Sequence, residues 1–168
     1  FNSIYNSGRT AADLVRTVLS HSKKTKSRHL PTDLNFVLDD VLEILRNTSS
    51  RKICFERIIG SGSPIVMGDK SQLTNAILNI GINAVYAIGD DEGKVTFEIQ
   101  KEDVSSNTCC QICRKQIEHG KYVTLSINDT GSGIEPGIIA KIFEPLFTSK
   151  PVDKGTGLGL SAVANTLN

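Results

Sequence analysis

The chain has 168 residues, a length that suits one domain or a small domain with an appended segment. Its 39% apolar and 22% charged residues support a packed core and exclude global disorder. Because 19 basic residues face 18 acidic ones, no basic excess indicates a nucleic-acid partner.

The first 24 residues predict one helix of a coiled-coil-like bundle. Small and apolar residues recur there at alternating spacings of four and three, which is a heptad seam. They are Ile4, Gly8, Ala11, Val15 and Val18. A helix this short needs a partner helix or a second chain, unless it packs as an ordinary amphipathic helix on its own domain. Residues 23–32 then predict a linker.

The middle of the chain predicts alternating helices and strands. Thr32 or Asp33 can cap a first long helix that continues to Asn47, and Asp69 can cap a second that Gly89 ends. The apolar face of the first helix consists of Leu34, Val37, Leu38, Val41, Leu42 and Leu45. The predicted strands are residues 52–59, the short piece 64–69, and residues 93–100 and 120–130. We therefore expect an α+β fold, a two-layer sandwich of helices on a mixed, mostly antiparallel sheet.

Cys109, Cys110 and Cys113 lie between the last two predicted strands. Cys110 and Cys113 have the spacing of zinc ligands, and His119 follows them. A structural zinc site usually needs four ligands from two such pairs, and the chain has no second pair. Reduced thiols on a surface hairpin are therefore favoured over zinc, and a disulfide is disfavoured further.

The second long helix carries Asn79 and Asn83 within an otherwise apolar stretch. Their spacing of four places both on one face, and Asn75 extends the row. Asparagine is a poor helix former and is costly to bury unpaired, so both amides need partners. An internal polar network would satisfy them. So would a hard cation with phosphate groups, because Mg²⁺ accepts oxygen ligands beside water and phosphate.

Two glycine-rich stretches follow. Asp129 ends a strand before Gly131 and Gly133, where a carboxylate can accept a hydrogen bond from an amine such as that of adenine. A plain loop is the alternative there. Residues 155–160, "GTGLGL", precede a predicted helix, but their spacing fits neither a dinucleotide fingerprint nor a P-loop. Free N–H groups at that helix start would face a polyphosphate, with Lys150 and Lys154 adding charge; a flexible turn is the alternative.

Four segments occur together and in order, and their combination is far more specific than any one of them. They are "QLTNAILNIGINAVYAI", "DTGSGI", "IFEPLFTSK" and "GTGLGL". In this order they resemble the N box, first glycine box, phenylalanine-containing box and second glycine box of sensor histidine kinases of two-component systems. That family belongs to the GHKL superfamily, with gyrase, heat-shock chaperone and mismatch-repair ATPases.

The resemblance divides the chain in two. Residues 1–30 resemble part of the second helix of a dimerisation and phosphotransfer hairpin, followed by its linker. Residues 31–168 resemble the catalytic ATP-binding domain, truncated at its C-terminus. Since the chain begins with Phe1 and ends soon after the glycines, we expect a fragment of a longer protein.

The resemblance also implies a site for ATP and Mg²⁺. Asn83 would hold Mg²⁺ with Asn79 near the phosphates, and Asp129 would bind the adenine amino group. The segment from Lys150 to Gly159 would form a lid over the phosphates. The implied ATP-binding residues are Asn79, Asn83, Asp129, Gly131, Gly133, Ile134, Lys150, Gly155, Thr156, Gly157, Leu158, Gly159 and Leu160.

The implied activity is transfer of the ATP γ-phosphate to a histidine and on to a response regulator receiver domain, within a homodimer. Hydrolytic relatives carry Glu where this chain has Asn79, and an amide cannot act as a general base, so transfer is favoured over hydrolysis. No histidine present matches the acceptor, so no catalytic histidine is assigned and the fragment alone is expected to be inactive. The alternative is a truncated or degenerate nucleotide-binding or dimerisation module without kinase activity.

No stretch approaches the roughly 18 consecutive apolar residues of a membrane span, and no signal peptide opens the chain. We therefore expect a cytoplasmic chain without membrane contact of its own, whether or not the parent protein is anchored in a membrane.

Overall fold

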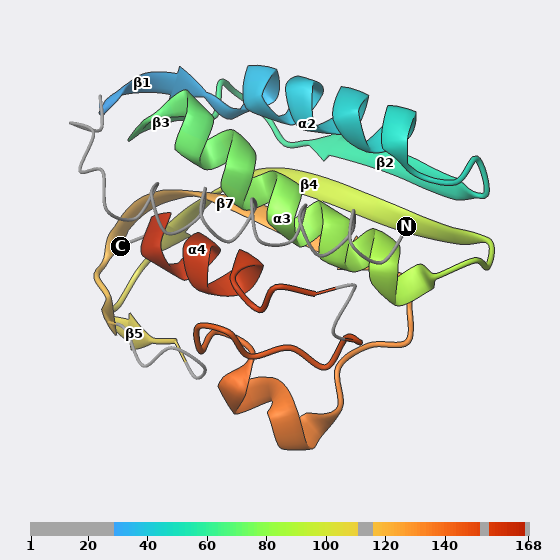
Figure 1. The fold of residues 1–168 in the computed structure, drawn as a ribbon. Coiled ribbons are helices and arrows are strands. Elements are labelled where there is room, and N and C mark those ends of the chain that lie inside the picture. The colour runs from blue at the N-terminus through green and yellow to red at the C-terminus, as the bar shows by residue number, and fades with distance from the viewer. Residues whose placement is uncertain (1–28, 111–115, 152–154, 167–168) are drawn as a thin grey trace.

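The computed structural model describes residues 29–110, 116–151 and 155–166, and helices lie on one face of a sheet in it (Figure 1). In chain order the elements are β1 (Leu30–Asp33), α2 (Leu34–Thr48), β2 (Ile53–Ile59), β3 (Ile65–Gly68), α3 (Lys70–Ile88), β4 (Gly93–Val104), β5 (Thr108–Cys109), β6 (Gln116–Ile117), β7 (Gly120–Asp129), the 3-10 helix η1 (Pro136–Lys141) and α4 (Gly159–Thr166). The predicted heptad helix of residues 1–24 lies outside the described residues and stays a prediction.

The main sheet is mixed. β2 pairs with β4 in parallel, and β4 pairs with β7 antiparallel, in the order β2-β4-β7. Parallel neighbours need a crossover connection, and α3 supplies most of it. β1 pairs with β3, and β5 with β6, both antiparallel. The predicted α+β fold with a mixed, mostly antiparallel sheet is thus confirmed.

The core lies between the sheet and the helices. All six apolar residues predicted for the first long helix are buried on α2. Opposite them, Val95, Phe97 and Ile99 occupy alternate positions of β4 and are also buried, as the two-residue strand period requires. A Cβ on Gly81 would lie 2.7 Å from Leu45 Cδ1, so α3 crosses α2 at close range. This crossing fixes the position of α3, the helix with the asparagine pair.

The predicted helix caps are confirmed. Asp33 accepts a hydrogen bond from the Asn35 amide at 2.9 Å, and Asp69 accepts from the amides of Ser71 and Gln72 at 2.9 and 3.2 Å. Gly89 ends α3 with a φ of 71°, a conformation that glycine adopts without steric cost.

One prediction was wrong. The linker expected over residues 23–32 includes residues of strand β1, in which Leu30 pairs with Gly68 and Asp33 with Ile65. The strand is short, and Pro31 suits an edge position because it has no N–H to donate. Its pairing partner lies more than thirty residues away, so no local pattern indicates it.

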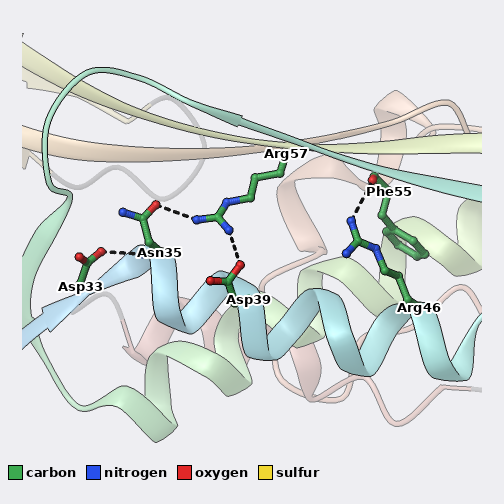
Figure 2. A network of polar contacts seen from close by, with 6 residues as sticks. All are labelled: Asp33, Asn35, Asp39, Arg46, Phe55 and Arg57. Carbon is green, nitrogen blue, oxygen red and sulfur yellow. Dashed lines mark hydrogen bonds and ion pairs between the residues drawn. The ribbon is translucent and has the colours of Figure 1, made fainter.

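A polar network joins α2 to strand β2. Figure 2 shows Arg57 reaching from β2 to Asn35 and Asp39 on α2, with a hydrogen bond of 2.9 Å to the Asn35 Oδ1 and an ion pair to Asp39. Farther along α2, Arg46 donates to the Phe55 carbonyl at 3.3 Å. These contacts hold the outer edge of α2 over the sheet. No helix in the described part of the chain has the length and apolar character needed to cross a membrane.

Candidate functional site

One face of α3 organises the predicted site residues. Asn79, Asn83 and Ala87 stand at successive intervals of four on this face. Each contacts a different segment from later in the chain. Asn79 contacts the start of α4, Asn83 contacts Lys150, and Ala87 contacts the loop after β7. Figure 1 shows α4 lying alongside α3. The sequence segments singled out above therefore meet along one helix.

At the first position, the Asn79 side-chain amide faces the glycine-rich stretch. Its Nδ2 donates to the Gly159 carbonyl at 3.5 Å, a long hydrogen bond. Gly159 opens α4, whose first turn is ordered by a hydrogen bond of 2.9 Å from the Ser161 hydroxyl to the Leu158 carbonyl. Asn79 thus lies beside a helix N-terminus, where backbone N–H groups and the helix dipole favour anions.

At the second position, the Asn83 amide oxygen accepts a hydrogen bond from an ammonium. Lys150 Nζ donates to Asn83 Oδ1 at 2.8 Å and lies 4.1 Å from the centre of the Tyr86 ring. Burial lowers the pKa of Lys150, because desolvation penalises the ammonium. The Asn83 oxygen and the Tyr86 ring thus contact an ammonium whose charge is partly opposed by desolvation.

At the third position, the loop after β7 packs on α3. Gly131 donates its amide to Asp129 Oδ1 at 2.9 Å, and the Ser132 amide donates to the Ala87 carbonyl at 3.0 Å. A Cβ on Gly131 would lie 2.5 Å from the Ala87 carbonyl carbon, so contact with α3 itself requires this glycine. Gly133 has open space around it but a φ of 72°, a backbone conformation that favours glycine over other residues.

The base-binding residues predicted from the resemblance are open to solvent. Asp129 is exposed, and Ile134 exposes 50% of its surface. Asp129 is the last residue of β7, and Ile134 lies in the loop that follows, which packs on the last turn of α3. An exposed carboxylate and an exposed apolar side chain on the same short segment can together recognise an amine-bearing ring.

The second glycine stretch packs against the segment before it, and we call the contact between Leu146 and Gly157 the clasp. The Leu146 amide donates to the Gly157 carbonyl at 2.9 Å, and a Cβ on Gly157 would lie 2.3 Å from the Leu146 carbonyl carbon. A Cβ on Gly155 would lie 2.5 Å from Thr148 Oγ1. Residues 152–154, between these contacts, lie outside the described residues. Gly157 thus allows two backbone segments to lie in direct contact, and Gly155 lies against side chains of the earlier segment.

Sequence reasoning missed several contact residues. Tyr86 stands three residues after Asn83 on α3, a spacing that places them on neighbouring positions of one face and could have indicated it. No local sequence pattern indicates the contacts of Leu146 and Ala87, because their partners are distant in sequence. In the described ranges, no group of His, Cys, Asp and Glu side chains could hold a metal ion, and Cys113 lies outside those ranges.

One surface hollow lies away from these residues. It has about 410 Å³ and is bounded by β1, the end of β3 and the first turns of α2 and α3. Its lining includes Leu30 and Phe36 but none of the predicted site residues. The face of α3 with the asparagines therefore does not border this hollow.

Comparisons with known proteins agree with this arrangement. The family described as histidine kinase-, DNA gyrase B- and HSP90-like ATPase matches residues 68–168. The chain is 32% identical over 161 residues to sensor kinase CckA of Brucella abortus strain 2308, covering 96% of this chain and 17% of the relative. It is 31% identical over 159 residues to sensor histidine kinase ZraS of Escherichia coli K12, covering 92% and 30%. A solved mycobacterial sensor histidine kinase, MprB, has a TM-score of 0.64 and 31% identity over 83% of this chain and 78% of that chain.

The fold and the segments gathered on α3 thus define the class, an α+β ATPase domain with helices on one face of the sheet. The chain belongs to the histidine kinase-, DNA gyrase B- and HSP90-like ATPase family, within its sensor histidine kinases. It spans less than a third of the length of CckA and ZraS.

Proposed function

We propose that this chain is the ATP-binding catalytic portion of a sensor histidine kinase, which transfers the γ-phosphate of ATP to a histidine outside the chain. The observation that carries this proposal is the face of α3. On it, Asn79 contacts the α4 start, Asn83 contacts Lys150, and Ala87 contacts the loop of Asp129. A polyphosphate needs helix N–H groups and cations near one another, and this arrangement supports both.

We assign the roles as the family resemblance implies. Asp129 accepts a hydrogen bond from the adenine amino group, and Ile134 packs on the ring. Gly131 and Gly133 shape the loop between these two residues. Lys150 and the glycines from Gly155 to Gly159 border the phosphates, with Thr156 between them. Leu158 and Leu160, both half-buried, anchor the start of α4.

The donor set fits Mg²⁺. Asn83 offers a neutral amide oxygen that already lies 2.8 Å from an ammonium, and Mg²⁺ takes few protein oxygens because phosphates and water complete its shell. When bound, the ion would neutralise charge on the phosphates during transfer. Asn79, an amide that donates to Gly159, can position phosphate but cannot take a proton from water, which favours transfer over hydrolysis.

Nucleotide binding tests the site. Calorimetric titration with a non-hydrolysable ATP analogue and Mg²⁺ should give a measurable Kd, and Asn83→Ala and Asp129→Ala should each weaken binding about tenfold or more. Asn75→Ala is the matched control, because Asn75 extends the same row one turn earlier and is exposed. Wild-type affinity in both site variants, or no binding by the wild type, would contradict the assignment.

The kinase step concerns the parent protein. We propose that residues 31–168 form its ATP-binding domain and residues 1–30 part of a dimerisation hairpin, and that a response regulator receives the phosphate. Its substrate, ATP, is consistent with a cytoplasmic location. Full-length parent protein incubated with γ-labelled ATP should acquire acid-labile, alkali-stable phosphate, as phosphohistidine does. Nucleotide binding without such phosphate in the parent would favour the alternative, a binding module without kinase activity.

A further inference from the structure

We propose that Lys150 is an internal counter-cation that competes with Mg²⁺ for the Asn83 amide oxygen, and so determines how strongly nucleotide binding depends on metal. This inference rests on the proposed function and concerns the regulation of the same site. It gives Lys150 a role different from that of a phosphate ligand acting together with the metal.

The contact geometry supports competition. Lys150 Nζ lies 2.8 Å from Asn83 Oδ1, which is full hydrogen-bond contact. The ammonium also lies 4.1 Å from the centre of the Tyr86 ring, whose negative face attracts cations. A divalent ion on the same oxygen would stand beside this ammonium. Because both side chains are half-buried, water screens the repulsion between two such cations only partly.

Among the described residues, the groups that contact the ammonium are neutral. Within the described ranges, the ion pairs join Arg57 to Asp39, Lys70 to Asp40 and Lys94 to Glu56, and none includes Lys150. An amide oxygen and an aromatic ring hold an ammonium less strongly than a carboxylate does. Polyphosphate is therefore a better partner than the present ones, and when metal is absent its arrival favours movement of the lysine from Asn83 to phosphate, in place of the metal.

The position of Lys150 in the chain suits such an exchange. Its backbone amide donates to Thr148 Oγ1 at 3.1 Å, and a Cβ on Gly155 would lie 2.9 Å from Lys150 Cβ. The lysine therefore lies directly against the glycine stretch that leads to α4. Because the stem of a lysine is flexible, the ammonium can change partners while the backbone stays in place.

The test compares metal dependence in two lysine variants. The Kd of an ATP analogue is measured with Mg²⁺ and with EDTA for wild type, Lys150→Met and Lys141→Met. Lys141 ends η1 and is exposed, so it is the matched control. If Lys150 substitutes for the metal, Lys150→Met weakens nucleotide binding about tenfold in EDTA but much less with Mg²⁺. The ratio of the Kd in EDTA to the Kd with Mg²⁺ therefore rises about tenfold in this variant. Lys141→Met keeps the wild-type ratio.

Equal weakening under both conditions would overturn the proposal, since it would mean that lysine and metal act together. A second measurement needs no nucleotide. In ¹⁵N-resolved spectra, the Asn83 side-chain amide should shift in Lys150→Met, and Mn²⁺ should broaden it at lower concentration than in wild type. Unchanged Asn83 signals and unchanged Mn²⁺ sensitivity would overturn the proposal. Failure of all variants to bind nucleotide would instead contradict the proposed function.

Discussion

Gly131 and Gly133 stand two positions apart in one loop, yet different features of the structure require them. Gly131 approaches the backbone of Ala87 so closely that a Cβ would lie 2.5 Å from its carbonyl carbon. Gly133 has open space but a φ of 72°. Sequence reasoning assigned both to a ligand pocket. The contact with α3 shows that Gly131 has a structural task whether or not a ligand binds.

We expect alanine at these positions to destabilise the protein by different mechanisms. Gly131→Ala should lower the free energy of unfolding by about 1–3 kcal/mol, because backbone must shift to admit the methyl group. Gly133→Ala should lower it by about 1–2 kcal/mol through conformation alone. Denaturant unfolding measures both. Gly137→Ala is the control, with open space around its Cβ and an expected change within about 0.5 kcal/mol. A Gly131→Ala midpoint equal to that of Gly137→Ala would contradict the close contact.

At the scale of elements, Arg57 connects α2 to β2. Its side chain exposes 23% of its surface, while Asp39 exposes 55%. A pair at the surface, Lys70 with Asp40, has a contact of 2.8 Å but exposures of 55% and 48%. Water screens the second pair more, so the two pairs should differ in energy although both are ion pairs.

Double-mutant cycles measure that difference. The cycle of Arg57→Met with Asp39→Ala should give a coupling energy of about 1 kcal/mol. The matched cycle of Lys70→Met with Asp40→Ala should give about 0.3 kcal/mol or less, and added salt should reduce it further. Methionine keeps the apolar stem in both cases, so packing changes little. Equal coupling in the two cycles would show that the partial burial of Arg57 does not strengthen its ion pair with Asp39.

Local patterns predicted the elements whose causes are local. The buried face of α2 follows from apolar spacing, and the ends of α2 and α3 follow from Asp33, Asp69 and Gly89. Strand β1 was missed because its pairing with β3 is non-local. The contact of Lys150 with Asn83 joins residues 67 positions apart, and it depends on how α3 lies against the later segments. Spacing alone could indicate the asparagine row but not which groups face it.

The whole molecule combines a strongly packed part with a weakly packed one. Six residues of α2 are buried, whereas α4 buries Ser161 and Val163. Beside α4, the clasp between Leu146 and Gly157 rests on one backbone hydrogen bond of 2.9 Å and close backbone contact. Segments with few buried apolar contacts open at lower free energy than the core. The phosphate side of the proposed site thus lies in the part expected to open first.

Amide hydrogen exchange tests this division. Amides of α4 should exchange at least about tenfold faster than those of α2. An ATP analogue with Mg²⁺ should slow amide exchange in α4 while leaving the exchange rates of α2 unchanged. Gly157→Ala should speed exchange in α4 further, because a Cβ would lie 2.3 Å from the Leu146 carbonyl carbon and break the clasp. Gly137→Ala again serves as the control. Equal protection of α4 and α2 would mean that both open as one cooperative unit, and nucleotide would then have no local opening to suppress.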